Sequence, residues 1–83
     1  MNFKMAMDLV KKAEPKRTIT ACCDYDGDHY VVTALSDLSK FGENDPFFAV
    51  NKKTGEVTEF TPGADIPKFS EAMSKRLVYL AKG

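Results

Sequence analysis

The amino-acid sequence predicts a single α+β domain, in which a four-stranded antiparallel meander is flanked by an N-terminal and a C-terminal helix. Apolar residues recur at helical spacing near both ends of the chain, as in amphipathic helices. Between the ends, apolar and polar residues alternate in runs separated by turn-forming residues, which indicates two consecutive β-hairpins. The chain has 83 residues, so we expect one domain spanning residues 1–83.

The N-terminal helix is predicted over Asn2 to Ala13. Asn2 is a suitable N-cap, and Pro15 should end the helix because the residue before a proline is pushed out of the α region. Lys11 and Lys12 lie in the last turns, where cations interact favourably with the helix dipole. The apolar stripe consists of Phe3, Ala6, Leu9, Val10 and Ala13.

The first hairpin is predicted over Thr18 to Leu35, around a two-residue Asp26-Gly27 turn of type I′. The cross-strand pairs are then Cys23 with Tyr30, Ala21 with Val32, and Ile19 with Ala34. Directly opposed residues share a face of the sheet, so the apolar face consists of Ile19, Ala21, Cys23, Tyr30, Val32 and Ala34. The opposite, mostly polar face consists of Thr20, Cys22, Asp24, His29, Val31 and Thr33. We expect the helices to cover the apolar face and the polar face to be more exposed.

A polar loop from Ser36 to Asp45 leads to the second hairpin. Its strands are predicted over Phe47 to Asn51 and Glu56 to Phe60, with Gly55 in the left-handed conformation of the turn. The pairs are Val50 with Val57, Phe48 with Glu59, and Phe47 with Phe60. Two alternatives exist for the inward face, either Phe48, Val50 and Val57 or Phe47, Ala49 and Phe60, and the second is favoured.

The C-terminal helix is predicted over Ile66 to Ala81, with Asp65 as its N-cap and Pro67 in the first turn. The apolar stripe expected to pack on the sheet consists of Ile66, Phe69, Met73, Leu77 and Leu80. Val78 and Tyr79 lie off that stripe. We expect both to be exposed and to mark a surface for a protein partner.

The charge balance argues against nucleic-acid binding. Lysine and arginine together number 12, aspartate and glutamate also number 12, and the formal net charge is zero. Proteins that bind nucleic acid by neutralising phosphates carry a basic excess. No run of residues approaches the roughly 18 to 20 apolar residues of a membrane span, and Met1 to Val10 lack the layout of a signal peptide. We therefore expect no nucleic-acid or membrane partner and a cytoplasmic location.

An acidic stretch at the first turn looks like the start of a calcium loop. Asp24, Asp26 and Asp28 alternate there as in such loops. The sixth and twelfth positions should be glycine and glutamate, but this chain has His29 and Leu35 there. We therefore interpret the stretch as a hairpin turn and expect no metal site.

The other reactive residue types are interpreted as structural. Cys22 and Cys23 are adjacent, so on a strand they point to opposite faces and a disulfide between them is unfavourable. A nucleophile formed by Cys22 and His29, the only histidine, lacks a third orienting group. The aromatic residues suit a small core better than a base-stacking platform, since no basic groove accompanies them. We expect no enzyme activity, no catalytic residue and no cofactor.

The segment from Asp45 to Val57 resembles a hairpin found in PepSY-type domains, in immunity proteins encoded beside bacterial toxins, and in small uncharacterised proteins of tailed phages and prophages. The phage group is the most similar. Its members also have an N-terminal helix, an acidic-aromatic hairpin like Asp24 to Tyr30, and a stretch like Phe60 to Phe69. These motifs are mostly turns, which specify backbone geometry and carry no active site.

The resemblance implies a phage-encoded protein that acts by contact with a protein partner, as an interaction module or a virion-associated structural component in the host cytoplasm or the virion. A second copy of the chain and a phage capsid assembly are candidate partners. The alternative is an immunity or inhibitor protein, including an anti-defence protein, that blocks one cognate enzyme. The candidate partner-binding residues are Val78, Tyr79, Asp24, Asp26 and Asp28, the three aspartates because acidic clusters steer association.

Overall fold

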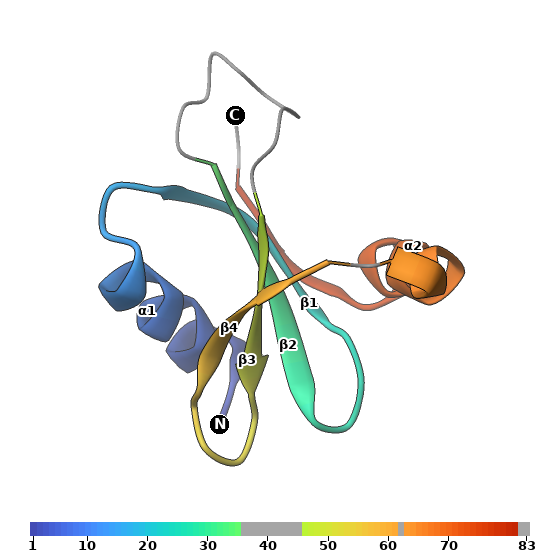
Figure 1. Cartoon of the computed structure of the whole chain (residues 1–83), viewed down its shortest axis with the longest axis horizontal. Coiled ribbons are helices and arrows are strands. Elements are labelled where there is room, and N and C mark those ends of the chain that lie inside the picture. Colours follow the sequence, from blue (N-terminus) through green and yellow to red (C-terminus); the bar gives the residue numbers. More distant parts are fainter. Residues whose placement is uncertain (36–45, 62, 82–83) are drawn as a thin grey trace.

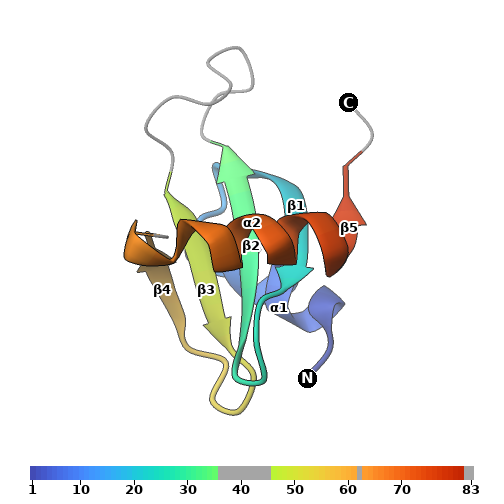
Figure 2. The ribbon, with the colours of Figure 1, turned by 90° about the vertical axis from the view of Figure 1, so that its right-hand side faces the viewer.

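The computed structural model describes residues 1–35, 46–61 and 63–81. Its elements are α1 (Phe3–Ala13), β1 (Thr18–Asp24), β2 (His29–Leu35), β3 (Phe47–Asn51), β4 (Val57–Phe60), the short 3-10 turn η2 (Gly63–Asp65), α2 (Ile66–Lys75) and β5 (Leu77–Leu80). The strands form one antiparallel sheet in the order β4-β3-β2-β1-β5. Helix α1 covers one face of the sheet and α2 covers the other (Figure 1, Figure 2).

The predicted α+β class with two flanking helices is confirmed, although the sheet has five strands where four were predicted. The predicted loop from Ser36 to Asp45 lies outside the described residues. The helices lie on opposite faces of the sheet, so both faces contribute to the core. This arrangement changes which strand residues are buried.

Helix α1 forms as predicted. The Asn2 side chain accepts a hydrogen bond from the main-chain N–H of Met5 at 3.0 Å, which satisfies one of the unpaired donors of the first turn. The helix ends at Ala13, before Pro15. Ala6 and Val10 are its buried residues, and they lie on the stripe that was predicted to face the sheet.

The register of the first hairpin differs from the prediction by one residue near the turn, whereas the predicted pair of Ile19 with Ala34 is confirmed. Asp24 pairs with Tyr30 and Cys22 pairs with Val32, whereas the prediction paired Cys23 with Tyr30. A shift of one residue moves every side chain of a strand to the other face. The predicted division of this hairpin into two faces is therefore wrong for β1 from Ala21 to Asp24, whereas Ile19, Tyr30, Val32 and Ala34 share one face as predicted.

The cause of the shift is the side chain of Asp26. Its Oδ1 accepts hydrogen bonds from the main-chain N–H groups of Asp28 and His29, both at 2.8 Å. The N–H groups of Tyr25 and Asp26 both donate to the carbonyl oxygen of His29, at 3.2 and 3.3 Å. An aspartate that bonds to the backbone ahead of it stabilises a wider turn. Gly27 accordingly does not adopt the positive φ that a type I′ turn needs.

The shift places the two cysteines on the faces opposite to those predicted. Cys22 shares the α1 side with Val32, and Cys23 lies on the α2 side. A β-bulge between Ile19 and Ala21 then restores the alignment, so that Ile19 also lies on the α1 side. Each strand of this hairpin therefore buries side chains on both faces.

The second hairpin has the predicted register, with Val50 opposite Val57 and Phe47 opposite Phe60. Gly55 adopts a φ of 77°, the left-handed conformation predicted for this turn. The Asn51 side chain accepts hydrogen bonds from the main-chain N–H groups of Lys53 and Thr54, at 2.8 and 3.0 Å. This side-chain cap fixes the turn without changing the strand pairing.

The core consists of two layers. The cluster on the α1 side contains the buried residues Ala6, Val10, Cys22, Val32, Ala34, Phe48 and Val50. The cluster on the α2 side contains the buried residues Cys23, Tyr25, Val31 and Ala72, with Phe47, Phe60, Phe69 and Met73 packed against them. Both alternatives for the inward face of the second hairpin therefore occur, one on each side of the sheet.

The predicted C-terminal helix is correct as far as Lys75 and wrong beyond it. The chain leaves the helix at Arg76 and continues as β5, which pairs with β1. A short apolar run such as Leu-Val-Tyr-Leu fits helical and strand periodicity equally well. Its β-branched and aromatic residues suit a strand, and the free edge of β1 supplies a pairing partner.

The predicted apolar stripe is divided between these two elements. Phe69 and Met73 pack on the sheet as predicted. Ile66 is 59 % exposed, so it is not part of the core. Leu77 and Leu80 lie on β5 and are also exposed.

Candidate functional site

The outer edge of β5 is the most unusual surface in the described part of the chain. On its inner side β5 pairs with β1, with Leu80 opposite Ala21 and Leu77 opposite Cys23. On its outer side no strand of the described residues pairs with it. An edge strand presents unpaired N–H and C=O groups along its length, and these are a template for another strand.

A β-bulge places both leucines of β5 on one face. Val78 is the extra residue, because Tyr79 pairs with Cys22 while Leu77 pairs with the next residue along β1. Leu77 and Leu80 therefore share the α2 face with the β1 residues opposite them. Leu77 is 38 % exposed and Leu80 is 67 % exposed. Two large apolar side chains thus lie next to each other beside an open strand edge.

The two residues predicted to mark a partner surface differ in burial. Val78 is 38 % exposed, in agreement with the prediction. Tyr79 is half-buried and packs against the core cluster on the α1 side, so the expectation of its exposure is wrong. Leu77 and Leu80 were assigned to a buried helical stripe. Their exposure depends on the helix-to-strand change at Arg76, which periodicity alone does not indicate because the run fits both helical and strand spacing.

The opposite edge of the sheet is different in character. Strand β4 presents the exposed polar residues Thr58 and Glu59. Charged residues on an edge strand disfavour the addition of another strand. Strand β5 has no charged residue between Leu77 and Leu80. Of the two edges, only that of β5 lacks this protection.

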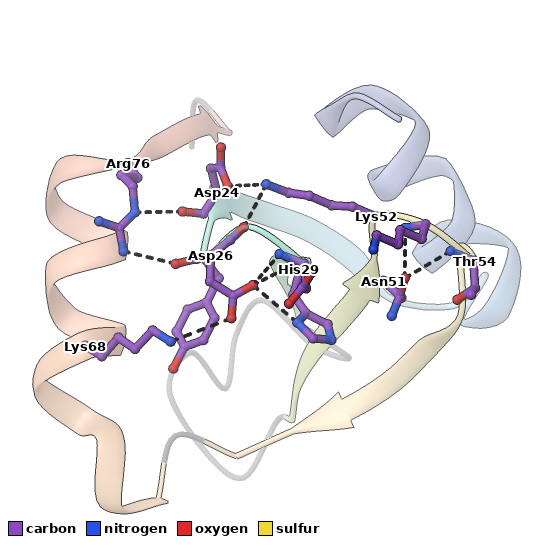
Figure 3. A network of polar contacts seen from close by, with 11 residues as sticks. Asp24, Asp26, His29, Asn51, Lys52, Thr54, Lys68 and Arg76 are labelled. Carbon is purple, nitrogen blue, oxygen red and sulfur yellow. Dashed lines mark hydrogen bonds and ion pairs between the residues drawn. The ribbon is translucent and has the colours of Figure 1, made fainter.

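The acidic turn between β1 and β2 forms a second candidate site, which the structure shows to be internally paired (Figure 3). Lys52 extends from the β3–β4 turn and places its Nζ 2.6 Å from an Asp24 carboxylate oxygen and 2.8 Å from the carbonyl oxygen of Asp26. The same ammonium lies 4.7 Å from the centroid of the Tyr30 ring. Lys52 is therefore held against the acidic turn and does not simply extend into solvent.

Asp26 is held by contacts on several sides. Besides its bonds to the main chain, its Oδ1 lies 3.3 Å from His29 Nδ1, and its Oδ2 lies 3.6 Å from Lys68 Nζ on α2. Burial alone would raise the pKa of Asp26, but the hydrogen bonds from the backbone N–H groups of Asp28 and His29 outweigh it, and the pKa lies below its ordinary value. The carboxylate therefore stays ionised and stabilises the turn.

His29 has the geometry of an oriented imidazole. An ionised carboxylate can only accept hydrogen bonds, so Nδ1 is the donor in the 3.3 Å contact to Asp26. The ring borders a depression of about 310 Å³ whose lining also includes Thr58, Phe60 and Lys68. The described residues contain no group of three or more histidine, cysteine or acidic side chains that could hold a metal ion.

Arg76 joins the acidic turn to the last helix. Its Nε donates to the carbonyl oxygen of Asp24 at 2.9 Å and its Nη2 to that of Tyr25 at 3.0 Å (Figure 3). The Arg76 carbonyl accepts from the Asp24 N–H at 3.0 Å. The roles of Lys52, Lys68 and Arg76 cannot be predicted from local sequence patterns, because these side chains contact the turn across large sequence separations. Their contacts explain the acidic cluster as part of the structure.

The cysteines are buried in the core. Cys22 has no exposed surface, and burial, with smaller effects from Cys23 and Asp24, raises its pKa to about 12. Burial also raises the pKa of Cys23. A thiol acts as a nucleophile in its thiolate form, so neither residue is suited to that role near neutral pH.

Comparisons of the chain with protein-family models, with curated proteins and with solved structures found no match. Neither helix in the described ranges has the length and apolar character needed to cross a membrane.

Proposed function

We propose that this chain is a non-enzymatic protein-interaction module that receives a protein partner at the free edge of β5. The supporting observation is the uncharged edge strand, with Leu77 and Leu80 exposed together on one face. Partners that add a strand to a sheet gain main-chain hydrogen bonds along the edge and side-chain contacts at alternate positions. Such a surface needs no catalytic group.

The alternative of an inhibitor steered by acidic residues has less support. Asp24 and Asp26 each lie within ion-pair distance of a lysine, and Arg76 lies beside the same turn. This pairing weakens the field that the aspartates would present to a basic enzyme. Asp28 is exposed, but one carboxylate gives little steering.

The narrower proposal, a component of a phage particle, is supported only by the resemblance of residues 24–30, 45–57 and 60–69 to small phage proteins. Gene neighbourhood tests it directly. A position among portal and capsid genes would favour a particle component, whereas a position beside a toxin gene would favour an inhibitor.

Affinity capture from the native host, with wild-type and variant chains compared, tests the interaction module itself. Leu80→Lys adds a charge to the β5 edge, and Ile66→Lys adds the same charge to an apolar position at the start of α2 that is also mostly exposed. We expect the specific partner to be lost with Leu80→Lys and retained with Ile66→Lys. Identical sets of captured proteins for all three chains would overturn the proposal.

A further inference from the structure

We infer that the β5 edge pairs with the β5 edge of a second copy of this chain, in antiparallel orientation, to form one continuous ten-stranded sheet from two five-stranded sheets. The inference rests on the proposed function, because it names the partner of the same edge. Two-fold symmetric dimers are the commonest protein assemblies, and they require a surface that is complementary to itself.

The positions of the two leucines supply that self-complementarity. In an antiparallel pair, a residue near the start of one strand lies opposite a residue near the end of the other. Leu77 of one copy then lies opposite Leu80 of the other, and the same contact recurs across the two-fold axis. Opposed residues must share a face, and the bulge at Val78 places both leucines on the α2 face. The four leucines thus meet as one apolar cluster.

The distribution of charge also suits a second copy. Strand β5 contains no charged side chain, so antiparallel pairing opposes no like charges within it. The formal net charge of the chain is zero, so two copies do not repel each other at long range. By contrast, Glu59 on the β4 edge would meet a second carboxylate nearby if that edge paired with itself.

The strand has only four residues, so we expect a dimer whose population depends on concentration. Light scattering during size-exclusion chromatography measures this directly. The average mass of the wild type should rise from 9.2 kDa toward twice that value as concentration increases. Leu80→Lys should remain at the monomer mass, and Ile66→Lys should follow the wild type. Circular dichroism of each chain checks that all three are folded.

A charge-pair experiment tests the strand register. Leu77→Glu and Leu80→Lys chains should each be monomeric alone. When they are mixed, the introduced glutamate of one copy faces the introduced lysine of the other, and the mixture should regain the dimer mass. A mixture that stays monomeric would overturn the proposed contact between Leu77 and Leu80.

Failure of the dimer and failure of the interaction module give different results. If the wild type stays at 9.2 kDa at every concentration, the second-copy inference is wrong. The proposed function then stands if Leu80→Lys alone loses a captured protein, and it falls if no variant changes capture. If the wild type dimerises but Leu80→Lys and Ile66→Lys change the dimer mass equally, the dimer interface does not lie at the β5 edge. The inference is then also wrong.

Discussion

The guanidinium of Arg76 donates a hydrogen bond to the main-chain carbonyl of Asp24, with 2.9 Å between Nε and the oxygen. The main-chain N–H of Asp24 donates back to the carbonyl of Arg76 at 3.0 Å. The point where α2 becomes β5 is therefore fixed to the point where β1 ends. This contact positions the edge strand against the sheet and makes the acidic turn a structural support for the proposed interaction surface.

Replacement of Arg76 should loosen this junction. Arg76→Met removes the side-chain hydrogen bonds to the carbonyl oxygens of Asp24 and Tyr25 while keeping the aliphatic stem. We expect the free energy of unfolding to fall by about 1 to 3 kcal/mol, measured by urea denaturation. Lys75→Met changes the exposed neighbouring residue and should alter stability by no more than about 0.5 kcal/mol. Equal effects of the two substitutions would contradict this role.

The lowered pKa of Asp26 predicts a loss of stability in acid. A carboxyl group whose pKa is lower in the folded than in the unfolded state binds protons more readily when unfolded. Its contribution is present above the unfolded pKa and disappears as pH falls through the folded pKa. Asp26→Asn keeps an acceptor oxygen but removes the ionisation, so the decrease of stability on acidification should be shallower than in the wild type.

Thermal unfolding over a series of acidic pH values measures this difference. Asp28→Asn is the matched control, since its carboxylate takes no part in the hydrogen bonds that hold the turn. It should reproduce the acid profile of the wild type. Parallel profiles for Asp26→Asn and the wild type would show that the Asp26 hydrogen bonds do not contribute to acid sensitivity.

The contrast between the two hairpins shows how far the sequence determines the fold. The second hairpin was predicted correctly because Gly55 and the length of its turn determine the register. In the first hairpin, the side chain of Asp26 competes with the type I′ turn that Asp-Gly favours. Composition cannot reveal which of these two local hydrogen-bond patterns prevails, and the outcome decides the face of the β1 residues from Ala21 to Asp24.

The candidate site was less predictable than the fold. The edge on which Leu80 lies exists only because β5 joins β1, a pairing between residues far apart in the chain. Lys52 lies 28 residues from Asp24, and Arg76 lies 52 residues from it. Patterns of helical or strand period carry no information about such contacts. The exposure of Val78 was predicted correctly, although for a helix instead of a strand.

The buried thiols should be unreactive in the folded protein. Burial raises the pKa of Cys22 to about 12, so almost none of it is thiolate at neutral pH. A thiol-specific chromogenic reagent should therefore react slowly with the native chain and rapidly with both free cysteines in denaturant. Because the folded state favours the protonated thiol, stability should also fall as pH rises above the ordinary pKa of 9.0. Rapid reaction of either Cys22 or Cys23 in the native protein would show that this cysteine is not buried.

The two neighbours Val78 and Tyr79 should respond differently to the same substitution. Val78 is the exposed residue of a bulge, so Val78→Ser should change the free energy of unfolding by about 0.5 kcal/mol or less. Tyr79 packs against the α1-side core, so Tyr79→Ser should destabilise the domain by roughly 2 to 4 kcal/mol. Urea denaturation of both variants measures the difference. The mass of the folded Val78→Ser chain, measured by light scattering, shows separately whether the β5 edge still forms the dimer. If Tyr79→Ser unfolds at the wild-type urea concentration, then Tyr79 belongs to the surface, and the assignment of the α1-side core is wrong at this strand.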